Sequence, residues 1–450
     1  MGLGDLPSNK DTPLARGGRS SSLGWKPGRG IMAQVSDVIV LGAGIVGIAT
    51  GIYLLRRGRS VTLIDKNEPG HETSFGNAGI IQREGVRPHA FPRDLHMLMQ
   101  VGLHLSTAAR YEPLALPRLA PALLRYWWAS SPESYRKVVQ SYAPLIGRSI
   151  ITHADLMADA GPEAEALVSK SGWLLAFRSE KGLRHEAEKA LGDQAFGISH
   201  KVVEWPELKQ MEPSLIGGLA GAIHWTDPWT VRDPGALVSQ YFALFQRLGG
   251  TFVEGAANGL TEANGGWTTL VNGATVSGKQ AVVALGPWAP EVLDRLGYRL
   301  PLFVKRGYHM HYGTEGNATL NKLVLDAEVG YALAPMARGI RLTTGAEFAM
   351  RDAAPSPIQL GKAERAAKEL FPLGERRDPQ PWKGARPCTP DMMPIIGKAP
   401  RHEGLYVGVG HAHHGFTLGP ATGELLAQAM TGEATAIDIK PFGMERFLRG

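Results

Sequence analysis

The hydrophobic pattern of this chain is most regular between residues 38 and 65. An apolar, β-branched run at 38–41 is typical of a buried strand. A helical pattern then extends to Arg57, and a second apolar run predicts a strand that ends at Asp65. The stretch 38–55 carries no charge and is long enough to span a membrane. Its four closely spaced glycines and the strand that follows favour a β-α-β unit instead.

The turn inside this unit carries the pattern G-x-G-x-x-G. A first glycine allows the tight turn, a second lets the backbone approach a pyrophosphate, and a third lets helix and strand pack closely. The N–H groups at the start of the helix then attract phosphate, and an acid about 20 residues on accepts ribose hydroxyls. The residues in question are Gly42, Ala43, Gly44, Ile45, Val46, Gly47 and, as the acid, Asp65. This combination predicts a dinucleotide-binding site.

Two further blocks follow from periodicity. The first block, which contains a helix at 236–248 and a buried strand at 281–285, resembles the first unit. A split nucleotide-binding domain would resume there. The other alternates apolar and polar residues, which predicts an antiparallel sheet. We expect helices at 236–248, at 359–370 and from Gly423 onward, a buried strand at 281–285, and alternating strands across 302–344.

Composition narrows the class of protein. A chain of 450 residues is long for one hydrophobic core, so two domains are expected. Hydrophobic and charged contents of 44% and 20% are those of an ordinary globular protein. The net charge of +6 is small for this length and forms no basic stripe, so nucleic acid is not an expected partner. The single cysteine, Cys388, excludes an internal disulfide and a cysteine-rich metal site.

The first 31 residues are rich in Gly, Ser and Arg and contain no apolar segment, so we expect a disordered tail. An alternative is that translation starts at Met32, immediately before the first strand. Near the other end, His411, His413 and His414 suggest a metal site. No carboxylate cluster accompanies them, and a tight turn does not converge three rings on one ion, so we predict no metal.

Several motifs together resemble one family. They are GAGIVG with Asp65, ETSFGNAG at 72–79, KRGYHMHY at 305–312, GARPCTPDMMPIIG at 384–397 and GHAHHGFTLGPATGELLA at 410–427. The chain resembles the FAD-dependent D-amino-acid dehydrogenase group of the glycine oxidase/sarcosine oxidase/D-amino-acid oxidase superfamily. The resemblance covers essentially the whole chain except the tail. It implies FAD as cofactor and two domains, each built from discontinuous segments.

The resemblance also implies a fold and its boundaries. We expect a Rossmann-like FAD-binding α/β domain with a parallel sheet, formed by residues 32–90, 232–296 and 383–450. An α+β substrate domain with a mixed or antiparallel sheet would comprise 91–231 and 297–382.

Cofactor contacts are carried over position by position. Beyond the glycine-rich turn and Asp65, residues of the polar loop line the diphosphate and flavin, and the segment after Gly410 places N–H groups against the flavin N1/C2=O edge. That edge becomes negative on reduction, so a helix N-terminus stabilises it. The implied residues are Lys66, Thr73, Ser74, Asn77, Ala78, Gly79, Ala257, Gly286, Gly415, Phe416 and Thr417.

Arg386 matches the arginine that relatives use to fix the substrate carboxylate, a role that suits a guanidinium fork. Tyr308 and His414 complete the set of expected catalytic residues; Tyr308 has the opposite alternation phase to its histidine neighbours, so at most one set faces the flavin. Sarcosine oxidases attach flavin through a cysteine two residues before this arginine. Gly384 stands there in this chain, so we expect non-covalent FAD.

The expected activity is oxidation of the Cα–N bond of a D-amino acid to an imine, which hydrolyses to a 2-oxo acid and ammonia. Oxidation of glycine, sarcosine or D-hydroxyproline remains an alternative, as does a flavin subunit of an opine-oxidase-like complex. The expected partners are a small amino-acid substrate and quinone or O2 as electron acceptor. We expect a cytoplasmic location, with peripheral contact at the inner face of the membrane as an alternative. A homo-oligomer or a hetero-subunit is left open.

Overall fold

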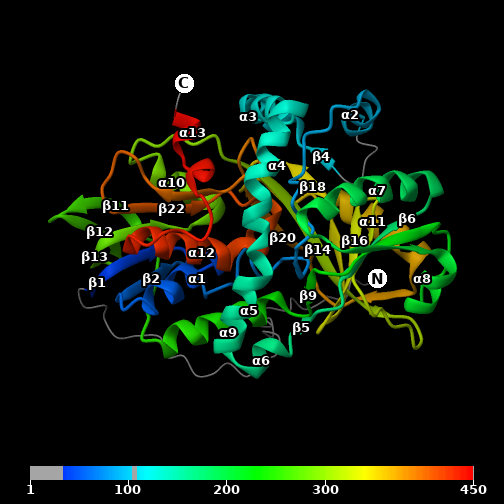
Figure 1. The fold of residues 1–450 in the computed structure, drawn as a ribbon, viewed down its shortest axis with the longest axis horizontal. Helices are drawn as coiled ribbons and strands as arrows, with labels where there is room; N and C mark the ends of the chain where they lie inside the picture. The colour runs from blue at the N-terminus through cyan, green and yellow to red at the C-terminus, as the bar shows by residue number, and fades with distance from the viewer. Residues whose placement is uncertain (1–33, 104–108, 449–450) are drawn as a thin grey trace, which may run out of the picture.

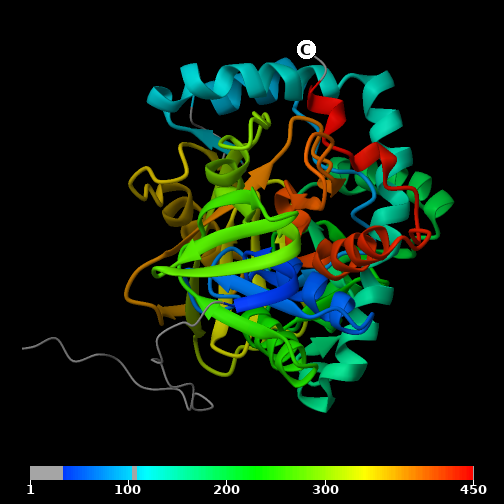
Figure 2. The same ribbon diagram turned by 90° about the vertical axis from the view of Figure 1, so that its left-hand side faces the viewer.

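The computed structural model describes residues 34–103 and 109–448. Two large sheets dominate the described part, one on the left and one on the right of Figure 1, and Figure 2 looks onto the first of them. The expected disordered tail at 1–31 lies outside the described residues.

The first sheet has eight strands in the order β10-β2-β1-β13-β12-β11, with β22 paired to β13 and β21 to β22. Strands β10, β2, β1, β13 and β22 run parallel, which confirms the expected parallel sheet. The strands are β1 Gln34–Leu41, β2 Val61–Asp65, β10 Thr251–Glu254, β11 Asn258–Ala263, β12 Gly266–Val271, β13 Ala274–Val283, β21 Ile395–Lys398 and β22 Leu405–Val409.

Helix α1 (Ile45–Leu55) follows β1 and packs between two other helices, α9 (Pro234–Arg247) and α12 (Gly415–Thr431). Glycines permit these close approaches. A Cβ at Gly423 would lie 2.6 Å from the backbone of Thr50, and one at Gly51 would lie 2.7 Å from the Phe245 ring. Residues 38–55 are therefore divided between a buried strand and a buried helix. Among the described residues, no helix has the length and apolar character needed to cross a bilayer.

The second sheet has eleven strands in the order β4-β18-β14-β17-β16-β15-β6-β8-β7, and β19 and β20 also pair with β14. Most pairs are antiparallel, whereas β15–β6 and β18–β4 are parallel, so the expected mixed sheet is confirmed. The strands are β4 Ala109–Tyr111, β6 Trp173–Phe177, β7 His200–Glu204, β8 Gly221–Trp225, β14 Phe303–Thr314, β15 Val324–Asp326, β16 Tyr331–Met336, β17 Gly339–Thr344, β18 Ala346–Phe348, β19 Leu373–Arg376 and β20 Trp382–Cys388.

The remaining elements surround these sheets. A small sheet of β3 (Ile80–Ile81), β9 (Trp229–Val231) and β5 (Val168–Ser169) connects them. The other helices are α2 Leu95–Gly102, α3 Leu116–Ala129, α4 Pro132–Gly147, α5 Ser149–Ala160, α6 Pro162–Glu165, α7 Glu180–Asp193, α8 Trp205–Met211, α10 Ala289–Leu293, α11 Ile358–Leu370 and α13 Glu445–Leu448.

The expected boundary at residue 383 falls inside strand β20. This strand pairs with β14 along seven residues, from Phe303 opposite Cys388 to His309 opposite Trp382. The chain therefore leaves the second sheet only after Cys388. The first residues of the expected segment 383–450 therefore form a strand of the second sheet.

Helix α12 begins at Gly415, eight residues before the expected start at Gly423. The segment contains Pro420, whose missing N–H cannot donate to the carbonyl of Phe416. The buried ring of His153 takes over, because its Nε2 lies 3.0 Å from that carbonyl oxygen. Burial lowers the pKa of His153 to about 4, so the ring is neutral and Nε2–H donates.

Candidate active site

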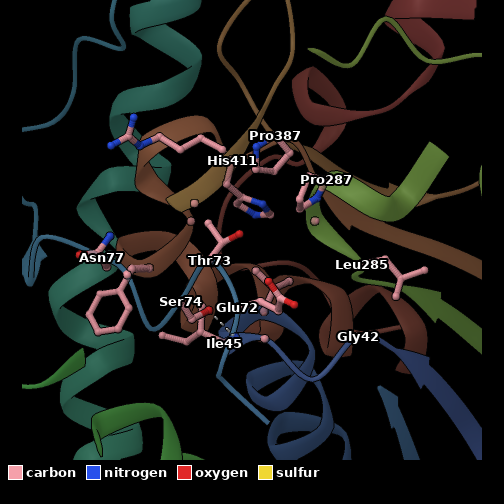
Figure 3. Close-up of a pocket in the computed structure, with 18 of the residues that line it drawn as sticks. Gly42, Ile45, Glu72, Thr73, Ser74, Asn77, Leu285, Pro287, Pro387 and His411 are labelled. Carbon is pink, nitrogen blue, oxygen red and sulfur yellow. Dashed lines mark hydrogen bonds between the residues drawn. The ribbon is translucent and has the colours of Figure 1, made fainter. Parts of the chain in front are cut away.

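A cavity of about 2100 Å³, counted with its open mouth, lies between the two sheets. Its wall combines the start of α1, the end of β2, the loop at 72–78, the loops after β10 and β13, strand β20 and the start of α12. Figure 3 shows Glu72, Thr73 and His411 around the same space. Segments far apart in the chain therefore meet at one site.

The three glycines of the turn have different roles. Gly42 has φ +110°, and a Cβ there would lie 2.4 Å from the carbonyl oxygen of Ala284. A Cβ on Gly47 would lie 1.8 Å from the carbonyl oxygen of Gly42. The protein's own backbone therefore requires glycine at both positions.

Gly44 is different, because its backbone is extended and a Cβ there would meet only the Ser74 Oγ, at 3.5 Å. That Cβ would fit the protein itself and would take up space in the cavity, where a phosphate would meet the start of α1. Thr343 supports the same conclusion from the other sheet, because it lines the cavity with a buried hydroxyl that has no partner among the described residues. Both features fit a large polar ligand such as a dinucleotide.

Asp65 ends β2 at the cavity wall. Its Oδ2 accepts a hydrogen bond from the N–H of Ala43 at 2.7 Å, and its Oδ1 accepts one from Asn67 at 3.0 Å. These two bonds fix the carboxylate, and each oxygen keeps lone pairs for a hydroxyl group. Lys66 follows, with its ammonium 4.6 Å from the centre of the Trp288 ring, and both line the cavity.

The loop at 72–79 is attached to both sides of the cavity. Ser74 Oγ accepts the N–H of Ile45 at 3.2 Å (dashed in Figure 3), and the Thr73 hydroxyl donates to the carbonyl oxygen of Ala385 at 3.1 Å. Asn77 Oδ1 accepts the N–H of Gly79 at 2.8 Å and so closes the turn. This polar loop therefore connects helix α1 to strand β20.

A buried network holds the same loop from the second sheet. The Arg341 guanidinium donates to the carbonyl oxygen of Asn77, and its Nε lies 3.0 Å from His311 Nε2. His311 Nδ1 in turn lies 2.7 Å from Asp378 Oδ2. Burial lowers the pKa of His311, so the neutral ring accepts from Arg341 and donates to Asp378. Sequence reasoning missed Arg341 and Asp378, because no local motif marks either residue.

Most of the expected site residues line the cavity. Those that do are Gly42, Gly44, Ile45, Val46, Asp65, Lys66, Thr73, Ser74, Asn77, Ala78, Ala257, Gly286, Tyr308, Arg386, Gly415 and Phe416. Ala43, Gly47, Gly79, Thr417 and His414 are not part of the lining. Thr417 is directed elsewhere, because its hydroxyl donates to the carbonyl oxygen of Ile80 at 3.1 Å.

Arg386 lies on the cavity face of the β14–β20 pair. In the register Lys305 is opposite Arg386, and Gly307 is opposite Gly384. The guanidinium lies against Gly307, where a Cβ would be 2.5 Å from Nη2. Its Nη1 donates to the carbonyl oxygen of Gly345 at 3.5 Å, and no carboxylate of the described residues forms an ion pair with it. A desolvated guanidinium of this kind needs an anion from outside the protein.

Tyr308 follows the opposite phase of the same strand, as the alternation predicts. Its hydroxyl donates to Glu347 Oε2 at 2.7 Å and accepts the N–H of Ser356 at 2.9 Å. Glu347 also forms a fully buried ion pair with Arg306. The hydroxyl is therefore engaged on the face opposite the Arg386 side chain, although Tyr308 is one of the residues that line the cavity. Its catalytic role stays a prediction.

The three histidines of the C-terminal turn contact three different partners. His411 Nε2 lies 2.8 Å from the Thr422 hydroxyl, and His413 packs against His89 with ring centroids 4.3 Å apart. His414, expected to be catalytic, is buried outside the cavity with Nδ1 2.7 Å from the Tyr142 hydroxyl. Burial lowers the pKa values of His411 and His414 to about 3, so both rings are neutral. Within the described residues, no three potential metal ligands form a group.

Comparison with known proteins defines the class. The model of the FAD-dependent oxidoreductase family, DAO, matches residues 37–429, so the chain belongs to that family. FAD is accordingly the cofactor that the cavity accommodates.

Two curated relatives are each 30% identical to this chain. A D-amino acid dehydrogenase from Methylobacterium nodulans matches over 92% of this chain and 99% of its own length. A D-amino-acid oxidase from Bradyrhizobium diazoefficiens matches over 93% and 100%. Among solved structures, glycine oxidase from Geobacillus kaustophilus shares the fold with a TM-score of 0.70 at 22% identity, over 92% of this chain and 99% of that one.

Proposed function

We propose that this chain oxidises the Cα–N bond of a D-amino acid to an imine, which water then hydrolyses to a 2-oxo acid and ammonia. The observation that carries the proposal is Arg386, a half-buried guanidinium that lines a cavity fitting FAD and has no carboxylate partner in the described protein. The names of the two curated relatives support a D-amino-acid substrate.

Bound FAD supplies a hydride acceptor at its N5 atom. Arg386 orients the substrate by holding its carboxylate through two parallel hydrogen bonds, which fixes the direction of the Cα–H bond. Gly415 and Phe416 place the positive end of helix α12 at the cavity, where negative charge develops on reduction. The neutral histidines around the site add no positive charge, so a neutral substrate amine keeps its lone pair available.

Anaerobic mixing of the FAD-loaded protein with candidate substrates tests the proposal. We expect D-amino acids to bleach the flavin absorbance faster than their L-enantiomers, glycine or sarcosine, because the carboxylate anchor and the flavin together select one face of Cα. Bleaching by dithionite alone, with none of the amino acids active, would contradict the proposal. This assay reports the donor without assuming an acceptor.

The acceptor, the assembly state and the location are separate proposals. Quinone or O2 receives the electrons, and the chain acts in the cytoplasm, alone or in contact with the inner face of the membrane. Turnover of an artificial dye by the purified single chain supports a homo-oligomer or monomer, whereas inactivity that a second subunit relieves supports a hetero-complex. Glycerol-gradient sedimentation with and without vesicles tests the membrane contact.

A further inference from the structure

A second cation lies directly beside Arg386. Lys305 is its partner in the antiparallel register of β14 and β20. Residues directly opposite each other in such a pair point to the same face, with Cα atoms about 4.5–5.5 Å apart. The two positive side chains therefore project from neighbouring strands toward the same region.

The surroundings of Lys305 are mostly apolar. Its Nζ lies 4.4 Å from the centre of the Tyr126 ring and 5.4 Å from that of Phe348. Its polar contacts are the Tyr126 hydroxyl at 3.0 Å and Met392 Sδ at 3.7 Å. The Tyr126 hydroxyl already donates to the carbonyl oxygen of His89 at 2.6 Å, so it accepts from Lys305. An ammonium has three donors, and these contacts leave at least one for a ligand.

No described anion compensates the two cations. Neither Lys305 nor Arg386 forms an ion pair with a described carboxylate. Cys388 lies nearby, but burial raises the pKa of its thiol, so it is neutral at neutral pH. Burial, together with the charges of Lys305 and Arg386, lowers the pKa of His89 to about 4, so that ring is neutral as well.

Two other arginines of the chain, one buried and one partly exposed, are paired with carboxylates. Arg306 pairs with Glu347, and both side chains are 1% exposed. Arg148 forms two hydrogen bonds of 2.7 Å with Glu424. Arg306 and Arg148 thus have carboxylate partners, whereas Arg386 and Lys305 have none among the described residues. Arg386 lines the cavity, and Lys305 lies directly beside it in the neighbouring strand.

Two like charges without counterions in a desolvated site repel each other and lose hydration, and one substrate carboxylate compensates only one of them. We propose that the site takes amino acids with two carboxylates, the first held by Arg386 and the second by Lys305. This inference rests on the proposed function and names its substrate class. The second carboxylate belongs either to the side chain, as in D-aspartate and D-glutamate, or to a substituent on nitrogen, as in iminodiacetate.

Steady-state kinetics with a dye acceptor test the proposal on matched substrates. We expect kcat/KM for D-glutamate, D-aspartate or iminodiacetate to exceed that for the uncharged counterparts D-glutamine, D-asparagine or sarcosine by at least about tenfold, which corresponds to one ion pair of about 1.4 kcal/mol. The acid that shows the largest ratio of kcat/KM over its counterpart indicates whether the second carboxylate is on the side chain or on nitrogen. Equal values for acid and amide would overturn the inference while leaving the proposed function intact.

Lys305→Met keeps the apolar stem and removes the charge. We expect it to lower kcat/KM for the dicarboxylate at least about tenfold and to leave that for the amide unchanged, with FAD content preserved. Lys398→Met, at an exposed lysine paired with Glu403, is the matched control and should change neither value. An equal loss of kcat on acid and amide would instead make Lys305 a proton-transfer residue and refute the second carboxylate site.

Binding without turnover provides an independent readout. Glutarate and succinate carry two carboxylates and no amine, so they should raise the melting temperature of the FAD-loaded protein more than butyrate does. Lys305→Met should remove the difference; if that variant fails to fold, the wild-type comparison alone decides. Selective stabilisation by dicarboxylates without amino-acid oxidation would refute the proposed function only, whereas oxidation without selective stabilisation would refute this inference only.

Discussion

Substitution of Arg386 separates two roles that a buried arginine can have. If the residue were structural, its loss would leave a buried partner unpaired and lower stability. The described protein offers it only the carbonyl oxygen of Gly345, at 3.5 Å. Arg386→Ala therefore removes an uncompensated buried charge, and the melting temperature of the FAD-free protein should not fall. Arg306→Ala is the contrasting control, because it leaves Glu347 unpaired and should cost about 3–5 kcal/mol.

The catalytic effect of Arg386→Ala should be large. A desolvated, charge-assisted pair with the substrate carboxylate is worth about 2–5 kcal/mol, so kcat/KM should fall about 30- to 4000-fold. Arg386→Lys should restore only part of the loss, because an ammonium does not form two parallel hydrogen bonds. FAD content, read from the visible spectrum, should stay normal. Wild-type kcat/KM on the best substrate in the alanine variant would refute the role.

Three further predictions concern the cofactor and stability. Gly44→Ala should fold normally by circular dichroism but retain less FAD, because the added Cβ fits the protein and intrudes on the phosphate position; full FAD content would contradict this. Acid precipitation should release FAD into the supernatant, whereas flavin in the pellet would show a covalent link. Burial raises the pKa of Glu84 to about 7, so its contribution to stability is complete below pH 4.5 and is lost as the pH rises through 7. Between pH 4.5 and pH 8 the wild type should lose up to about 3 kcal/mol of unfolding free energy from this group, and Glu84→Gln should not. Denaturant titrations of both proteins at these two pH values measure the difference.

The nucleotide-binding unit could be predicted almost to the residue, because its signals are local. Strand, glycine turn, helix and second strand follow one another without a break, and the structure has them as β1, α1 and β2, ending at Asp65. Period and turn chemistry also indicated the alternating sheet and helices α9 and α11. These elements depend on neighbours within about 30 residues, which a sequence displays directly.

Helix α12 could not be predicted correctly, because the deciding contacts come from distant segments. Its first eight residues contain two glycines, Gly415 and Gly419, and Pro420, a composition typical of a turn. A helix forms there because α1 packs closely against Gly419 and Gly423. His153, from α5, also donates to the carbonyl oxygen that Pro420 leaves without its helical partner. Neither contact has a signature near residue 415.

The same reasoning explains why the sequence did not indicate that Lys305 lies beside Arg386. Arg386 was expected through a motif that relatives share, whereas Lys305 lies 81 positions earlier and becomes its neighbour only through the register of β14 and β20. A one-residue shift of that register would turn Lys305 to the face occupied by Arg306 and Glu347, where a carboxylate is present. The seven-residue pairing that ends at Cys388 thus decides whether a second cation without a carboxylate partner lies beside Arg386. The substrate charge selection that we propose for this chain therefore depends on strand register, which is a property of the fold.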